Sequence, residues 1–184
     1  MTAEQSPGPR RRWWAPLAVA VVVAVIAHLV VVLAAPRVVM GVAERRIAES
    51  AGGRNTWLHT PRVTPRNQQV VRSSPDLAYS ACVWDLSDGP VRVSAPGWDG
   101  YYSLSIYDDR TDVVFVDGDP HPEVTVLLAT TDQEDQARRA AGSDVEVVVV
   151  PAPDGVALLR YLAPTDDAFA DADRVRSSAV CAPA

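Results

Sequence analysis

VRVSAPGWDGYYSLSIY, residues 91–107, contains two short segments in which apolar and polar side chains alternate. The first segment covers residues 91–95 and the second covers residues 101–107, with proline and glycine residues between them. A period of two is typical of a β-strand that buries one face, and the intervening glycines favour a turn. This stretch therefore predicts two strands of a β-rich domain.

Strand-like segments continue on both sides of this stretch and are separated by Asp-Gly turns. Two polar segments between them carry helix-capping patterns: Thr131 with Glu134, ending near Gly142, and Thr165 before an acidic pair. Further strands are expected over residues 77–84, 113–116, 123–129, 145–150 and 156–162. We therefore predict an α+β fold class: an N-terminal transmembrane helix plus a mainly antiparallel β-sandwich-like domain with two short peripheral helices.

The transmembrane helix is predicted from residues 17–35, LAVAVVVAVIAHLVVVLAA, which carry no charge. At 1.5 Å per residue they match the ~30 Å hydrocarbon thickness of a bilayer. Trp13 and Trp14 fit an interfacial aromatic belt, and the arginines at 10–12 favour a cytoplasmic N-terminus. A cleaved signal peptide is the alternative, but its apolar region is normally shorter, and Pro36 follows the candidate cleavage site.

The domain organisation follows from this span. We expect a cytoplasmic tail at 1–16, the membrane helix at 17–35, a juxtamembrane helix and extended connector at 36–76, and an extracytoplasmic β-rich domain at 77–184. The chain would then be a single-pass protein of the cell (inner or plasma) membrane, with the lipid bilayer as one partner.

His28 lies near the middle of the apolar span. A polar ring in hydrocarbon is costly and usually faces a partner helix or a cavity. The alternative is a neutral histidine bonded to its own backbone, and the sequence leaves both interpretations open.

Composition excludes several classes of function. All 17 basic residues are arginine, and the net charge is -6. Without lysine, neither Schiff-base catalysis nor P-loop phosphate binding is available. The acidic balance beyond the span argues against nucleic-acid binding, which needs clustered cations.

No motif for catalysis or cofactor binding is present: there is no G-x-S-x-G, H-E-x-x-H, dinucleotide fingerprint or C-x-x-C. Asp117, Asp119, His121 and Glu123 alternate as oxygen and nitrogen ligands would, but EF-hand spacing is absent and prolines flank the histidine. A solvated acidic hairpin is favoured over a metal site. We expect a non-enzymatic protein without metal or cofactor, and a hydrolase that uses Asp117, Asp119 or His121 is the least favoured alternative.

The two cysteines, Cys82 and Cys181, are expected to form one disulfide, because two cysteines in an extracytoplasmic domain are usually paired. It would tie the first predicted strand to the C-terminal tail. A cysteine nucleophile is the alternative, but Cys82 lies in a strongly apolar segment, where a structural role is the default.

Asp85 and Arg160 each follow an apolar strand segment and could be partly buried. Because buried charges need partners, we predict a structural charge pair between strands, with a ligand-facing pair as the alternative. Trp98 and Tyr101 suggest an aromatic ligand surface for a glycan or lipid. The competing interpretation is that these rings fill the core or edge of the sandwich.

Several short motifs resemble the family known as domain of unknown function 1254, in particular its short membrane-anchored branch. They are SPDLAY (74–79), DLSDGPV (85–91), GYYSL (100–104), GVALLR (155–160) and CAP (181–183), together with the apolar span and its His28. The resemblance implies a β-sandwich or jelly-roll-like fold without an established activity. It also implies a heteromeric assembly with a second small membrane protein that carries the related domain of unknown function 1214.

The expected function is a non-enzymatic accessory or assembly subunit of the cell envelope. A binding module for an envelope glycan or lipid is the alternative. The chain lacks much of the segment that longer family members carry between the strand at Tyr102 and the strand at Val145, so no ligand site of those members is transferred to it.

Overall fold

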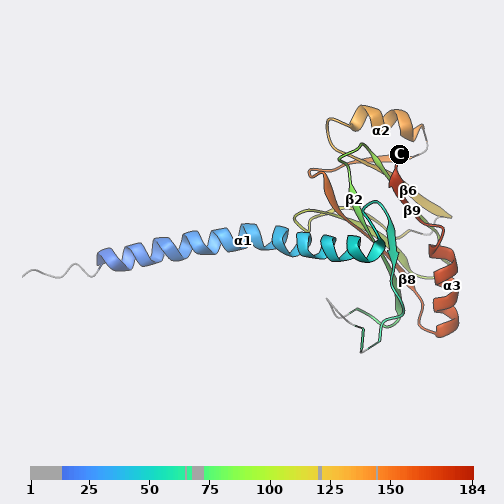
Figure 1. Cartoon of the computed structure of the whole chain (residues 1–184), viewed down its shortest axis with the longest axis horizontal. Coiled ribbons are helices and arrows are strands. Elements are labelled where there is room, and N and C mark those ends of the chain that lie inside the picture. Colours follow the sequence, from blue (N-terminus) through green and yellow to red (C-terminus); the bar gives the residue numbers. More distant parts are fainter. Residues whose placement is uncertain (1–13, 65, 68–72, 120–121, 144) are drawn as a thin grey trace, which may run out of the picture. The chain divides into compact units, whose positions relative to one another are not determined.

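The computed structural model describes residues 14–64, 66–67, 73–119, 122–143 and 145–184 (Figure 1). By its internal contacts the chain divides into two units, Met1–Pro36 and Arg37–Ala184. The second unit contains all the strands. It begins forty residues earlier than the β-rich domain expected at 77, because the end of the first helix packs on β2 and β8.

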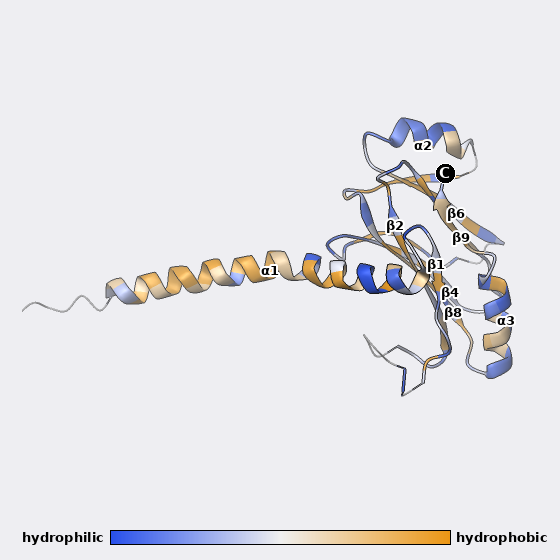
Figure 2. Cartoon of the chain, in the orientation of Figure 1, coloured by the Kyte–Doolittle hydropathy of each residue, from blue (hydrophilic) through white to orange (hydrophobic). Residues whose placement is uncertain are grey.

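The first helix, α1, runs over Trp14–Ala51 and contains Pro36. Among the described residues it is the one helix long and apolar enough to cross a membrane, a test that a signal sequence also passes. Figure 2 shows its long apolar stretch. The sequence suggested a separate helix after Pro36, but a single helix includes the proline, which costs one hydrogen bond without ending it. Gly52, with φ of 81°, follows its last residue.

Nine strands among the described residues form two sheets. Sheet A has the order β1-β2-β8-β4-β5, and sheet B has the order β7-β6-β3-β9. All neighbouring strands are antiparallel except β6 and β7. The strands are β1 (Trp57–His59), β2 (Leu77–Asp85), β3 (Val91–Pro96), β4 (Tyr102–Asp108), β5 (Val113–Asp117), β6 (Glu123–Ala129), β7 (Glu146–Val149), β8 (Asp154–Leu162) and β9 (Val180–Pro183).

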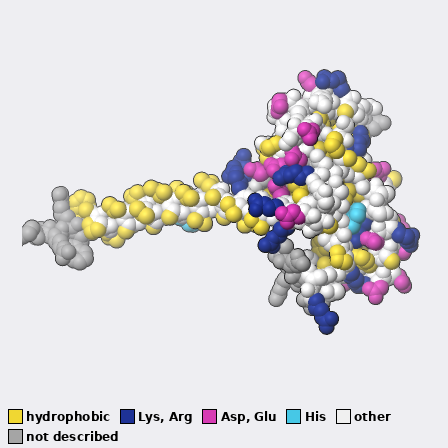
Figure 3. All heavy atoms as spheres, in the orientation of Figure 1, with side chains coloured by type: hydrophobic (Ala, Val, Ile, Leu, Met, Phe, Trp, Pro, Cys, Tyr) yellow, Lys and Arg dark blue, Asp and Glu magenta, His cyan; other side chains and the backbone are white. Residues whose placement is uncertain are grey.

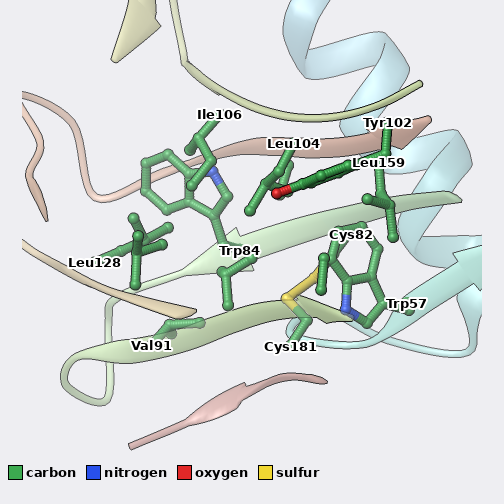
Figure 4. Packing of buried hydrophobic residues seen from close by; sticks show 14 of the residues in the cluster. Trp57, Cys82, Trp84, Val91, Tyr102, Leu104, Ile106, Leu128, Leu159 and Cys181 are labelled. Atoms are coloured by element: carbon green, nitrogen blue, oxygen red, sulfur yellow. A yellow bond between two sulfur atoms is a disulfide. The ribbon is translucent and has the colours of Figure 1, made fainter. Parts of the chain in front are cut away.

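The core lies between the inner faces of the two sheets. Trp84 of β2 is fully buried and packs in one cluster with Ile106 of sheet A and Leu128 of sheet B (Figure 4). The Cys82–Cys181 disulfide crosses this core and joins β2 to β9, which belongs to the other sheet. Both the α+β fold class and the disulfide expected from the sequence are therefore confirmed.

Two short helices, α2 (Glu134–Ala141) and α3 (Asp166–Arg176), complete the domain. Thr165 caps α3 as expected, because its side chain accepts a hydrogen bond from the backbone N–H of Ala168. The capping box predicted for α2 is wrong. Its N-cap is Gln133, whose side chain donates to the carbonyl of Leu86 instead of closing the helix end.

The seven predicted strands are all present, and β1 and β9 are additional. Both additional strands are short, and each depends on a partner distant in the sequence: Trp57 pairs with Cys82, and Cys181 pairs with Val93. Their pairing is a tertiary effect that local alternation does not reveal.

Replacing both Cys82 and Cys181 with alanine should lower the free energy of unfolding by about 4 kcal/mol, because the disulfide closes a loop with a sequence separation of 99. Urea unfolding of the full chain in detergent, followed by tryptophan fluorescence, measures this change. An unchanged unfolding midpoint would show that the disulfide does not constrain the unfolded chain.

Candidate functional site

A groove opens at one edge of the sandwich, where β5 at the end of sheet A faces β6 and β7 of sheet B. Its volume is about 400 Å³. Apolar side chains and one threonine form much of its wall: Phe115, Val116, Val124, Thr125 and Val126. Phe115 and Val124 also pack against the core, so their positions in the groove are fixed by the sandwich.

The strand edges that border this groove lack neighbouring strands within the described part of the chain. β5 is the last strand of sheet A and pairs with β4 alone. β6 pairs with β7 from Val126 onward, which leaves residues 123–125 open on that side. Such edges present free backbone N–H and C=O groups that another strand can use. Val113 and Val116 of β5 are more than half exposed.

The charged residues that line the groove in the described part of the chain are acidic: Asp117, Glu123 and Glu146. Asp117 is held in place because its Oδ2 accepts a hydrogen bond of 2.8 Å from the Tyr102 hydroxyl. Glu123 and Glu146 are exposed, at the start of β6 and of β7 respectively. The parallel pairing of these two strands brings Glu146 to β6, although it lies 23 residues after Glu123 in the sequence. The lining surface is more polar than apolar, so the groove combines a few apolar side chains with a negative rim.

The acidic run that includes Asp117 and Glu123 lies partly in the groove. Asp119 follows β5 and is exposed, whereas His121 lies outside the described residues. No group of three or more His, Cys, Asp or Glu side chains is arranged to hold a metal ion in the described part of the chain.

The charge pair predicted between Asp85 and Arg160 is wrong. The β2–β8 register places Asp85 opposite Asp154 and Arg160 opposite Tyr79, which separates the two charges by about 20 Å along the strands. Arg160 instead donates to the Ser105 hydroxyl at 3.0 Å. Alternation placed Arg160 in a strand and Asp85 directly after one, but the register that fixes their partners cannot be read from alternation alone.

The partners of Asp85 are Arg54 and Ser87, which lie near the end of β2. Arg54 Nη1 lies 3.5 Å from its carboxylate. Burial would raise the pKa of Asp85, but hydrogen bonds from the Ser87 hydroxyl and backbone N–H, together with Arg54, hold it below its usual value.

The two aromatic candidates differ in burial. Trp98 stacks on Tyr161 with ring centroids 5.5 Å apart, and its indole N–H donates to the carbonyl of Leu162 at 3.0 Å. Tyr101, in contrast, is 53% exposed. Trp84 and Tyr102 are buried in the core. Trp98 is therefore partly structural, and Tyr101 is the ring most open to a ligand.

His28 lies on α1 within the apolar stretch of the first unit. Its contact with another subunit stays a prediction, because a single chain cannot show one.

Sequence reasoning missed Arg176, a buried cation at the end of α3 that is 1% exposed. It donates to the carbonyls of Tyr79 and Thr60 and to the Asp173 carboxylate, at 2.5 to 2.8 Å. It thereby fastens α3 to sheet A. The signal was present in the sequence, because Arg176 lies seven residues after Phe169 and so on the apolar face of the helix.

A histidine and a serine adjoin Arg176 without forming a nucleophilic site. His59 Nδ1 lies 2.8 Å from Ser80 Oγ. Burial lowers the pKa of His59, and the nearby Arg176 lowers it further, while Asp173 opposes them. Ser80 is fully buried beneath the arginine, so its hydroxyl is closed to a substrate. The cluster is a structural network.

The fold and the groove define a two-sheet α+β domain with an open, acidic edge. The chain belongs to the family described as Protein of unknown function (DUF1254), whose pattern matches residues 54–183. The family resemblance expected from the sequence is confirmed.

Solved structures add a likeness of fold. The chain is similar to the VPA0106 protein from Vibrio parahaemolyticus, with 18% identity and a TM-score of 0.52, over 66% of this chain and 29% of that chain. It also matches an uncharacterized protein from Burkholderia cenocepacia, with 13% identity and a TM-score of 0.43, over 64% of this chain and 34% of that one. The chain therefore spans about a third of the length of these structures. No curated protein matches it.

Substituting Trp98 and Tyr101 separately should distinguish a structural ring from a ligand-facing ring. Trp98→Ala should lower the free energy of unfolding by about 2 kcal/mol, because it removes a stacked ring and its hydrogen bond. Tyr101→Ala should change it by less than about 0.5 kcal/mol. Urea unfolding of both variants tests this, and equal losses would contradict the assignment.

Proposed function

We propose that this protein is a non-enzymatic accessory subunit of the cell envelope, anchored by residues 17–35 and joined to a second small membrane protein through its β-domain. The observation that carries the proposal is the acidic groove at the open edge of the sandwich. The anchor and the absence of a catalytic motif in the sequence support it further.

The groove favours one kind of occupant: an extended segment of the partner that carries arginine or lysine beside apolar side chains. Such a segment can add to the free edge of β5 by backbone hydrogen bonds. Its apolar side chains would meet Phe115 and Val124, while its cations would meet Glu123 and Glu146. A second copy that offers the same groove would bring like charges together, which disfavours self-association at this edge.

The family resemblance implies that the partner carries the related domain of unknown function 1214, and the same bilayer would hold both chains. Anchoring two proteins in one membrane raises their effective concentration, so a groove of modest affinity can suffice for assembly. The N-terminus would be cytoplasmic and the β-domain extracytoplasmic, as the arginines at 10–12 favour.

Reversing two charges tests the groove. In Glu123→Arg/Glu146→Arg, co-purification with a tagged partner carrying the domain of unknown function 1214 should fall at least tenfold, because the rim would repel a cationic segment. The matched control is Asp88→Arg, which reverses an exposed charge in the turn before β3 and should leave co-purification unchanged. The measurement is recovery of the co-expressed partner in mild detergent.

The two ways to fail are distinguishable. If the wild-type chain retains no partner, the accessory function is contradicted. If the wild-type chain and the double variant retain it equally, the accessory function stands, and the groove is not the docking surface.

The role of His28 in the membrane span can be tested separately. His28→Leu should weaken retention of the same partner while leaving membrane insertion intact, because leucine preserves the apolar span and removes the polar contact. Membrane fractionation confirms insertion, and co-purification measures association. Unchanged association would make the segment a plain anchor.

The alternative function is a binding module for an envelope glycan or lipid, and the exposed ring of Tyr101 supports it. Loss of a retained glycan or lipid in Tyr101→Ala, at unchanged stability, would favour this alternative over the accessory role.

A further inference from the structure

The last turns of α1, residues 37–51, pack on the outer face of sheet A within the second unit. Met40 and Ile47 lie against Val83 of β2 and Val156 of β8, and both valines are buried. Glu44 lies between Met40 and Ile47 on the same helical face. A carboxyl group therefore occupies the middle of an apolar contact between helix and sheet.

Glu44 is buried, with 5% exposure, and its Oε1 has no hydrogen-bond partner. An ionised carboxylate in such a place costs far more free energy than a neutral one. Its nearest cation is Arg54, whose Nη2 lies 3.9 Å from Glu44 Oε2. Arg54 also lies 3.3 Å from Asp154 and 3.5 Å from Asp85, so three carboxylates share one guanidinium.

The groups that face Glu44 come from every element around it. Asp154 at the start of β8 lies close enough for its negative charge to disfavour ionisation of Glu44. Asp109, after β4, adds another negative charge, although Arg37 of α1 lies 3.4 Å from it. Figure 3 shows acidic and basic side chains gathered on this part of the second unit.

The net effect of these groups is to raise the pKa of Glu44. Burial is the largest cause, the charge of Asp154 comes next, and Arg54 only partly opposes them, so that the pKa of Glu44 rises from 4.5 to about 7. The protonated form fits the docked helix. The ionised form would leave a buried charge that Arg54, shared with Asp85 and Asp154, compensates only in part.

We propose that the end of α1 is a proton-dependent latch, docked on sheet A while Glu44 is protonated and released from it when Glu44 ionises. Released Glu44 regains its ordinary acidity in water. The stability of docking is therefore complete below about pH 4.5, declines as the pH rises, and reaches its minimum above about pH 7. Release exposes Val83 and Val156 and frees the helix from the β-domain.

A cysteine placed beneath the helix reports release directly. Val83→Cys puts a thiol at a fully buried position on the docked face, and the native cysteines do not compete because they form a disulfide. The full chain in detergent micelles is labelled with a maleimide from pH 4.5 to pH 8. Each rate is divided by the rate of the same thiol in a Glu44→Gln background, which cancels the pH dependence of the thiol itself.

The expected ratio rises at least tenfold between pH 5 and pH 7 and is flat above about pH 7, because glutamine cannot ionise and keeps the helix docked. Glu49→Gln is the matched control: Glu49 is exposed on the same helix, and its removal should leave the rise unchanged. Asp154→Asn should shrink the rise, because it removes the carboxylate that disfavours ionisation of Glu44.

A ratio that does not change with pH overturns the latch. Circular dichroism at each pH shows whether the domain stays folded. If Glu44→Gln alone proves unstable, the labelling rates with and without Asp154→Asn are compared at each pH instead. A rise with pH that Asp154→Asn does not diminish overturns the proposal.

Discussion

The pairing of β2 with β8 at the centre of sheet A is the constraint on which the rest of the structure depends. The ladder runs without a break from Leu77 opposite Leu162 to Asp85 opposite Asp154. Gly155 makes it possible, because a Cβ there would lie 2.2 Å from the carbonyl oxygen of Tyr107 and 2.5 Å from the Trp84 ring. No side chain larger than hydrogen fits without moving the backbone or the core indole. Once this register is set, one face of both strands lies in the core and the other lies beneath α1.

Burial of both faces of the central strands explains which elements the sequence could predict. The long strands were found because valine, leucine and aromatic residues recur at the right period, and the disulfide followed from cysteine count and compartment. The short strands β1 and β9 were missed because each has little pattern of its own and forms by pairing with a distant strand. Asp85 and Arg160 were paired wrongly for the same reason: alternation assigns a face, whereas register assigns a partner.

The groove was beyond a single sequence for a different reason. It lies between the end of one sheet and an edge of the other, so it exists only once the strand order of both sheets is known. The sequence marked Asp117 and Glu123 as acidic, but it gave no cause to join them to Glu146, which the parallel β6–β7 pairing supplies. The sequence signals Glu44 and Arg176 more clearly, since each is a charge on an otherwise apolar helical face. A charge of that kind predicts a buried partner network, although not which strands provide it.

The chain thus has two acidic regions, and they behave differently because one is exposed and the other is buried. The rim carboxylates Glu123 and Glu146 are exposed to water, so their attraction for a cationic partner is screened by salt and affects mainly the rate of encounter. Glu44 is shielded from solvent, so salt screens it weakly and its own protonation dominates its free energy. Partner docking at the groove should accordingly respond to ionic strength, and helix docking on sheet A should respond to pH. In the proposed roles, the same type of side chain is in one place a solvated recognition charge and in the other a titrating group, and the difference is the helix that covers Glu44.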